Sequence, residues 1–518
     1  MVFSYVALAA QIAYSFISIP LALSHLTTAE FGMWGLVTTV GSFLLLTELG
    51  MTESFMRHLF ECKDGRDPAK YGRLFTASCL ALGLVSLVVL AGGVLVGLFA
   101  APVLQIPPEL RQDFTWVMLG ASAMAALITA TRMLGVPLVL HHRQDLCQIG
   151  NLGLFAVKFL SLFLAFKAGW GIYALLAVEV AGALWVLPFN AWMCIRHGYF
   201  PEAGTFALPS RGEWTEVRNY SMSNFVIQIG GTVLTGLPQL LISSRVGLDA
   251  AGLWTVCTRV FSILKDIAVR PFGIANPMLL DFFVKGEVGR AVNRWVQVSQ
   301  VVMASAGLFF AVAAANNGRF IELWTGVGSA WGLVMHVSIG AYFLSFVAAG
   351  CAYGVIAFSK SFGVFRVVPL LQAAAVAGLS FLFADRFGSV GIILASALGF
   401  LLGMLFFGMR QLGLVTRHNA LRIFVSAIGR PLLIAPLVFA CAYLIGRSTE
   451  FLPGYPGLLL SAGSGFLLGL PLMGFLGVSK EVRGDLFGMA LKPLRRFLPA
   501  SPKPAAPAPV EPGPGLDP

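Results

Sequence analysis

The chain has 518 residues, of which 57% are hydrophobic and 11% charged, and its formal net charge is +11. Soluble domains carry about 25% charged residues, so this composition excludes an ordinary water-soluble globule. Apolar runs such as 80–101 and 388–409 match the roughly 20 residues with which a helix crosses the ~30 Å hydrocarbon core. Short segments of alternating polarity, which are typical of membrane barrels, are absent from the sequence. We therefore expect an all-α integral membrane protein.

The apolar runs predict about fourteen transmembrane helices. The first run begins at Val2 with almost no charge before it and no convincing cleavage site, so we interpret it as a membrane helix rather than a removable signal peptide. An even number of spans places both termini on the same side of the membrane. The expected spans are 2–23, 31–55, 74–100, 113–140, 149–166, 172–195, 219–243, 250–281, 297–315, 330–358, 367–384, 388–409, 424–445 and 456–478.

Loop charge predicts the orientation. With both termini inside, the inside segments hold 24 Lys and Arg residues and the outside connections hold six. This bias satisfies the positive-inside rule, and we expect a multi-pass protein of the bacterial inner membrane with cytoplasmic termini. The anionic inner leaflet is a sufficient partner for the basic charge, so membrane lipids are expected to contact it and nucleic acid is not.

The sequence contains an internal repeat. A shift of 220 positions brings 26–44 into register with 246–264, and six of the 19 positions are identical, including the pairs Gly32/Gly252 and Trp34/Trp254. Six predicted spans separate the copies, so the two halves have the same orientation, and parallel repeats of this kind are typical of transporters that hold substrate between their halves.

The repeat and the loops predict a domain organisation. We expect an N-terminal six-helix lobe at 1–196, a cytoplasmic linker at 197–218 and a C-terminal six-helix lobe at 219–410 around a central cavity. Two extra helices follow at 411–478. The last segment, 479–518, is basic and then proline-rich, and it is expected to be disordered.

Polar side chains at bilayer depth are costly and therefore mark sites of function. Five of them in the seventh span fall within an arc of about 80° on a helix. A narrower stripe occupies the equivalent first span. The alternative for both is hydrogen bonding between helices, but for the Asn and Gln side chains we favour a water-filled cavity. The residues are Asn224, Gln228, Thr232, Thr235 and Gln239, and Ser4, Gln11, Ser15 and Ser18.

Three charged residues of the eighth span lie within about 40° of one another if this span is one continuous helix. They are Arg259, Asp266 and Arg270, whereas Lys265 is expected to point about 120° away. Asp266 and Arg270 are also i, i+4 neighbours that can pair. A structural ion pair with snorkelling is the alternative, but Arg259 has no local partner in the sequence. We therefore predict an anion-binding cavity here.

Further charged residues fall within other spans. Lys158 sits in the middle of the fifth span, and Arg132 is placed close enough to the inside end of the fourth to snorkel. Glu48 and Glu179 are candidates for counter-ions or for protonatable groups that couple transport to an ion. The scattered cysteines and histidines predict no metal site, and we expect no cofactor.

Several short motifs point to one family. The first span ends in Leu26-Thr27-Thr28-Ala29-Glu30-Phe31-Gly32, the second closes on Glu48-Leu49-Gly50-Met51, and Arg57 and the basic loop 63–73 follow. These residues resemble the Wzx-type polysaccharide and O-antigen flippases of the multidrug/oligosaccharidyl-lipid/polysaccharide exporter superfamily, which have a MATE-like fold. The sequence departs from the family at Ser24-His25, where an arginine is common, so the main anion-binding residues are expected to be Arg259 and Arg270.

The resemblance implies a flippase that moves an undecaprenyl-diphosphate-linked oligosaccharide from the inner to the outer leaflet by alternating access. Such a protein serves the synthesis of lipopolysaccharide or exopolysaccharide, and polysaccharide polymerase or assembly proteins are its expected partners. Arginine suits a diphosphate because its planar fork matches the oxygens and stays charged. The energy source is left open between protons, sodium and the membrane potential.

Other functions remain as alternatives. A drug exporter of the same superfamily should have an acidic, aromatic cavity, whereas a peptidoglycan-precursor flippase would share the basic one. A membrane-embedded polymerase or glycosyltransferase needs a sizeable outside loop, and the outside loops here are short. The inside loops contain no glycine-rich phosphate-binding motif, so we do not expect an ATP-driven enzyme.

Overall fold

The computed structural model describes residues 2–48, 50–62, 67–202, 204–208, 210–326, 331–358, 368–416 and 419–485. Throughout these residues the regular secondary structure is helical, without a strand. Ten helices in this part of the chain are long and apolar enough to cross a membrane, and Ala9–Leu23 adds a shorter apolar helix. The predicted all-α, multi-span membrane fold is therefore confirmed.

The first half of the chain forms eight α-helices with three short 3-10 segments between them. The Thr27 side chain and Glu30 form a capping box at the start of α2, and Asp67 caps α4 ahead of Pro68. The helices are α1 (Val2–Leu23), α2 (Thr28–Leu44), α3 (Met51–Cys62), α4 (Pro68–Phe99), α5 (Arg111–Thr131), α6 (Val136–Leu140), α7 (Gln144–Lys167) and α8 (Tyr173–Arg196), with η1 (Leu45–Glu48), η2 (Pro108–Leu110) and η3 (Arg132–Leu134).

The second half begins with the long helix α9 and ends in helices interrupted by π-helical turns. Such turns are local expansions of an α-helix and are frequent at functional sites. The helices are α9 (Arg211–Arg245), α10 (Leu248–Cys257), α11 (Arg259–Ala268), α12 (Arg270–Val284), α13 (Val288–Thr325), α14 (Leu333–Phe358), α15 (Val368–Gly403), α16 (Met409–Thr416), α17 (Ala420–Phe424), α18 (Arg430–Ser448) and α19 (Gly454–Leu472), with the π-helical η5 (Met404–Gly408), η6 (Val425–Gly429) and η7 (Met473–Gly477).

Two of the predicted spans are broken rather than continuous. The second ends at Gly50, where φ is +66° and the chain leaves α2 and η1 for α3. The eighth is divided into α10, α11 and α12 by turns at Thr258 and Val269. The Thr258 hydroxyl donates to the Trp254 carbonyl at 2.7 Å, and Pro271 lacks the N–H that would continue the helix through Val269.

The eleventh and twelfth predicted spans form one helical run, Val368–Leu414, with a reversal inside it. At Gly388 the backbone has φ +53° and ψ −136°, which is not helical. The two arms pack antiparallel, because Gln372 Nε2 donates to the carbonyls of Gly399 and Phe400 at 3.3 and 3.4 Å. The two spans are therefore present, joined by a turn so tight that helical structure continues on both sides of it.

The helix boundaries follow the sequence repeat. α2 begins at Thr28 and α10 at Leu248, and α4 begins at Pro68 and α13 at Val288, each pair 220 positions apart. The break before α3 and the break before α12 also fall at equivalent positions to within one residue. The duplication that the sequence indicates over 19 residues thus extends through α2, α3 and α4 of the first half and α10 to α13 of the second.

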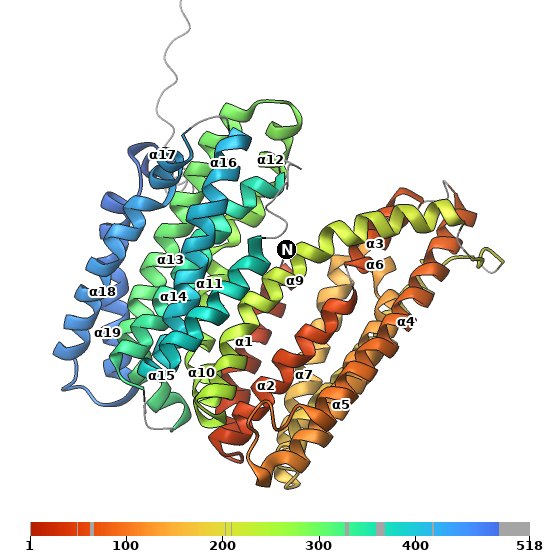
Figure 1. Ribbon diagram of the computed structural model, residues 1–518, viewed down its shortest axis with the longest axis horizontal. Helices are drawn as coiled ribbons and strands as arrows, with labels where there is room; N and C mark the ends of the chain where they lie inside the picture. The colour runs from red at the N-terminus through yellow and green to blue at the C-terminus, as the bar shows by residue number, and fades with distance from the viewer. Residues whose placement is uncertain are drawn as a thin grey trace, which may run out of the picture.

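The two halves lie side by side and meet at one end (Figure 1). α3 to α8 lie on one side and α11 to α19 on the other, converging where α2 packs against α10 and spreading apart toward α4 and α17. α9 begins beside α3 and ends against α15, so it connects the two halves directly. The contact between the halves is therefore made by equivalent helices of the repeat.

The last two long helices are fastened to α13 by polar contacts. Ser461 of α19 donates to Asn316 Oδ1 at 2.6 Å, and the Tyr455 hydroxyl donates to the Leu323 carbonyl at 2.8 Å. Arg319 of α13 also donates to the carbonyl of Leu452, in the loop between α18 and α19. The α18–α19 pair is thus an outer addition to the second half and does not reach the contact between halves.

Candidate substrate cavity

A cavity of about 400 Å³ lies between the two halves, next to the contact between α2 and α10. Its walls come from α1, α2 and α8 of the first half and from α9, α10 and α11 of the second. The residues that line it with polar atoms are Tyr14, Ser15, Ser18, Trp34, Thr38, Thr39, Glu179, Thr235, Gln239, Trp254, Thr255, Thr258, Arg259 and Ser262.

A pair of glycines forms a close contact between the two halves beside the cavity. A Cβ atom added at Gly32 would overlap the carbonyl oxygen of Leu248, and one added at Gly252 would overlap the carbonyl oxygen of Thr28. Beside this contact, the Thr28 hydroxyl donates to Asp249 Oδ1 at 2.6 Å. Only glycine allows the two helix backbones to approach this closely, so the pair acts as the seal between the halves.

Arg259 is the cationic side chain that lines the cavity. It begins α11, about two helical turns or ~10 Å from Gly252 along the chain, and is half-buried. Its Nε donates to the hydroxyl of Ser15 on α1, which joins the second half to the first. Within the part of the chain that the structure describes, its two terminal nitrogens have no hydrogen-bond partner. Arg259 therefore lines the cavity, and the terminal donors of its guanidinium are free in the described structure.

An ion pair forms one side wall of the cavity. Lys158 Nζ of α7 lies 2.8 Å from both carboxylate oxygens of Glu179 on α8. The Lys158 side chain is 18% exposed and that of Glu179 is 38% exposed, so the carboxylate is the partner that faces the cavity. Glu179, a candidate counter-ion in the sequence, thus pairs with Lys158, a match that the sequence did not indicate.

Gln239 is the member of the seventh-span stripe that lines the cavity with a buried side chain. Its Nε2 donates to the Ala251 carbonyl at 3.4 Å, and its Oε1 accepts from Thr255 at 3.4 Å, so it joins α9 to α10. The Gln11 side chain on α1 is exposed and is not among the lining residues. Asn224 and Gln228 belong to α9, but their side chains lie outside the described residues.

Asp266 and Arg270 do not line this cavity. The turn at Val269 separates Arg270 from α11, so the expected face of three charged residues is interrupted, and only Arg259 and Asp266 remain on the same helix. Asp266 is exposed, and its Oδ1 lies 3.3 Å from Lys265 Nζ, which was expected to point away from it. Arg270 begins α12 with an exposed side chain.

Glu48 and Arg132 form a second ion pair, away from the cavity. Glu48 belongs to η1 and Arg132 to η3, so each carries a charge at a break in its span. The buried Glu48 carboxylate also accepts from the hydroxyl of Thr52. Arg132 therefore pairs inside the first half instead of extending alone to the membrane surface.

The sequence did not single out Tyr14, Thr39 and Thr255 as lining residues, nor the two tryptophans that bound the cavity. Trp34 and Trp254 carried a usable signal, because they are identical residues at equivalent positions of the repeat. Thr39 is the position equivalent to Arg259, so the two halves present a hydroxyl and a guanidinium to the same space.

Comparison with known proteins shows similarity in structure and not in sequence. No family model and no curated protein sequence matches the chain. A multidrug-resistance MATE transporter of the MOP superfamily in an inward-facing conformation has a TM-score of 0.63 and 11% identity, over 78% of this chain and 95% of that one. The lipid II flippase MurJ in an inward closed conformation has a TM-score of 0.60 and 12% identity, over 96% of this chain and 100% of that one.

A third solved structure is a MOP-superfamily transporter from Pyrococcus furiosus, described by a binding pocket of reversed polarity. It has a TM-score of 0.52 and 12% identity, over 80% of this chain and 94% of that one. At these identities the similarity establishes the fold alone. The chain is a multi-pass membrane protein with the fold of the MOP-superfamily transporters.

Proposed function

We propose that the protein is a flippase for an undecaprenyl-diphosphate-linked oligosaccharide and works by alternating access. The observation that carries the proposal is Arg259, a half-buried guanidinium placed between the halves with its terminal nitrogens unpaired in the described structure. An arginine at bilayer depth requires water, a counter-ion or an anionic ligand. A diphosphate supplies oxygens that match the guanidinium fork.

The geometry suggests how the substrate would be held. Its diphosphate would bind Arg259 and the hydroxyl of Ser262. The hydroxyls of Thr38 and Thr39 donate to the Gly35 carbonyl at 2.9 Å, so their oxygens would accept from hydroxyls of the first sugar. A cavity of about 400 Å³ suits this part of the molecule, since small-ligand sites span roughly 300–1,000 Å³. The remaining sugars would extend toward the open end, and the lipid tail would stay in the bilayer.

The seal between the halves sets the direction of access. In the orientation predicted from loop charge, the Gly32–Gly252 contact lies toward the outside, so the cavity described here is open to the inside. Release would require α2 to separate from α10, breaking the Thr28–Asp249 hydrogen bond. Glu179 is the titratable carboxylate at the cavity and is our candidate for coupling the change to an ion.

The proposal is tested in a strain deleted for the gene and complemented with wild type, Arg259→Ala or Arg270→Ala. Lipid-linked oligosaccharide on the periplasmic face is quantified by the access of a glycan-modifying enzyme. We expect inside accumulation in the deletion strain and with Arg259→Ala at normal protein level. Arg270→Ala is the matched control, because Arg270 does not line the cavity. An unchanged distribution in the deletion strain would overturn the proposal.

Export of a small organic cation is the second candidate, and the same cavity contains the features that favour it. Glu179, Trp34 and Trp254 would attract and stack on a cation. Lys158 argues against cation export, because its ammonium lies 2.8 Å from the Glu179 carboxylate and already neutralises that charge. Reduced drug tolerance in the deletion strain, together with an unchanged oligosaccharide distribution, would favour this alternative.

A further inference from the structure

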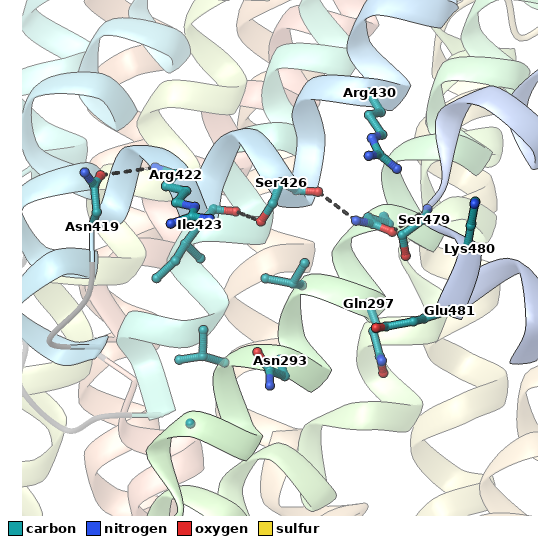
Figure 2. A pocket seen from close by; sticks show the side chains of 14 residues that line it. Asn293, Gln297, Asn419, Arg422, Ile423, Ser426, Arg430, Ser479, Lys480 and Glu481 are labelled. Atoms are coloured by element: carbon teal, nitrogen blue, oxygen red, sulfur yellow. Dashed lines mark hydrogen bonds between the residues drawn. The ribbon is translucent and has the colours of Figure 1, made fainter.

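A second and larger cavity lies at the opposite end of the second half, where α13 begins and α17 leads into α18 (Figure 2). Its volume is about 910 Å³. Ser479 and Lys480, which follow η7 in the chain, also line this cavity. None of its lining residues belongs to the cavity between the halves, so it is a separate site.

The second cavity carries an excess of positive charge. Arg422, Arg430 and Lys480 line it, and Glu481 is the acidic residue among the lining side chains. Within the described part of the chain, none of the three cationic side chains makes a hydrogen bond or an ion pair with protein. Figure 2 shows them spread around the space rather than directed to one protein acceptor. The cavity therefore holds about two uncompensated positive charges.

The walls of this cavity are fixed by one buried amide. Gln300 of α13 donates from Nε2 to the Ser426 carbonyl in η6 at 2.7 Å, and its Oε1 accepts from the Ser479 N–H at 3.0 Å. It is 5% exposed. Because one side chain bridges three segments, the positions of the surrounding cations are set by the fold. Gln297 and Asn293, one and two turns before it, add amide donors to the same wall.

The surface next to the cavity is apolar. Leu421 of α17 is 59% exposed, Val425 of η6 is 53% exposed and Leu433 of α18 is 78% exposed. In a membrane protein, side chains of this kind contact acyl chains. A ligand with an anionic phosphate and an apolar tail therefore fits both parts of the site, whereas a soluble phosphate fits the cationic part alone.

We propose that this cavity binds the phosphate group of an anionic phospholipid in the leaflet at this end of the protein. Arginine forks bind phosphate oxygens in pairs, and the nearby amides and hydroxyls complete the shell. A zwitterionic lipid brings its own cation and gains less from the excess positive charge. The leaflet is the inner one in the orientation predicted from loop charge. The proposal does not depend on what the protein transports.

The test uses the purified full-length protein in phosphatidylcholine nanodiscs with or without phosphatidylglycerol. Phosphatidylglycerol that stays bound after transfer to mild detergent is counted by native mass spectrometry. The variants are Arg422→Gln/Arg430→Gln, the charge-preserving Arg422→Lys/Arg430→Lys, and a matched control, Lys285→Gln/Arg290→Gln. The control removes the same charge from exposed residues that do not line the cavity. Size exclusion and thermal unfolding confirm that each variant is folded.

We expect the glutamine pair to retain about 30-fold less phosphatidylglycerol than wild type, since each of the two basic residues near an anionic surface contributes about 1 kcal/mol. The lysine pair should retain most of the binding, and the control should match wild type. Equal retention by wild type and the glutamine pair would overturn the proposal, as would an equal loss in the control. Displacement of the lipid by inorganic phosphate alone would overturn the assignment to a lipid and identify a soluble phosphate site.

Discussion

Gly32 of α2 and Gly252 of α10 pack against each other, and each also lies against the carbonyl of the residue four positions before its partner, Leu248 or Thr28. Because these positions are equivalent in the repeat, the contact is the same when it is viewed from either half. Interfaces with this property are formed by two-fold rotation. The duplicated motif thus packs against its own copy, at the place where the proposed alternating access requires the halves to separate.

Substituting Gly32 should open this contact. In Gly32→Ala the new methyl group meets backbone, which no side-chain rotation can relieve, so the closed arrangement should lose about 1–3 kcal/mol, a 5- to 150-fold change in population. The measurement is labelling of Thr38→Cys from outside by a membrane-impermeant maleimide, in a cysteine-free background. The control is Gly41→Ala, where a methyl group on the same helix meets no atom within 4 Å. Equal labelling of both variants would contradict the assignment of Gly32 to the seal.

Removing one partner of the Lys158–Glu179 pair should destabilise the protein more than replacing both partners with apolar residues. Glu179→Gln leaves a half-buried ammonium without its counter-ion, and we expect a loss of about 1–3 kcal/mol in stability, below the cost of a fully buried pair. The double change Lys158→Met/Glu179→Leu should recover most of the loss of thermal stability. If both variants unfold at the same temperature as wild type, the pair does not stabilise the first half. Transport by the stable double variant then reports whether Glu179 is required for coupling.

The Glu48–Arg132 pair is predicted to be structural. Arg132→Met leaves Glu48 buried with Thr52 as its remaining described partner, so apparent stability should fall by about 3 kcal/mol. Transport per folded molecule should be retained, because neither residue lines the cavity between the halves. Normal stability with abolished transport would instead assign Glu48 to ion coupling.

The tight turn at Gly388 supplies a test of the α15 hairpin. Its φ of +53° disfavours any residue with a Cβ, so Gly388→Ala should destabilise the protein by about 1–2 kcal/mol. Gly378→Ala, in the same helix with open space around it, should be neutral or slightly stabilising. Thermal unfolding of the two variants side by side checks the prediction, which fails if Gly388→Ala is the more stable.

The membrane class, the spans and the repeat were predictable because they depend on local hydrophobicity and on residue identity at a fixed shift. Breaks were less predictable, because they depend on single residues such as Gly50 and Pro271 inside otherwise apolar runs. The break at Val269 separates Arg270 from Arg259, whereas Asp266 lies on α11 with Arg259 but is exposed and does not line the cavity.

Partners across helices were not predictable from one sequence. Lys158 pairs with Glu179 over 21 positions and Arg132 with Glu48 over 84, and nothing local indicates either match. The hydrogen bond from Arg259 to Ser15 spans 244 positions and depends on how the two halves meet. The repeat could have indicated that Trp34 and Trp254 face a common space, since equivalent residues near a two-fold axis lie close together.

The most direct test of the central claim is flipping by purified protein. Proteoliposomes would carry a fluorescent undecaprenyl-diphosphate-linked oligosaccharide on one leaflet, and its arrival on the other would be followed with an impermeant quencher. We predict rapid exchange with wild type and Arg270→Ala, and at least tenfold slower exchange with Arg259→Ala, because a buried charge-assisted contact contributes about 1.5–3 kcal/mol. Equal rates for wild type and Arg259→Ala would contradict the account, as would the absence of exchange with folded wild-type protein.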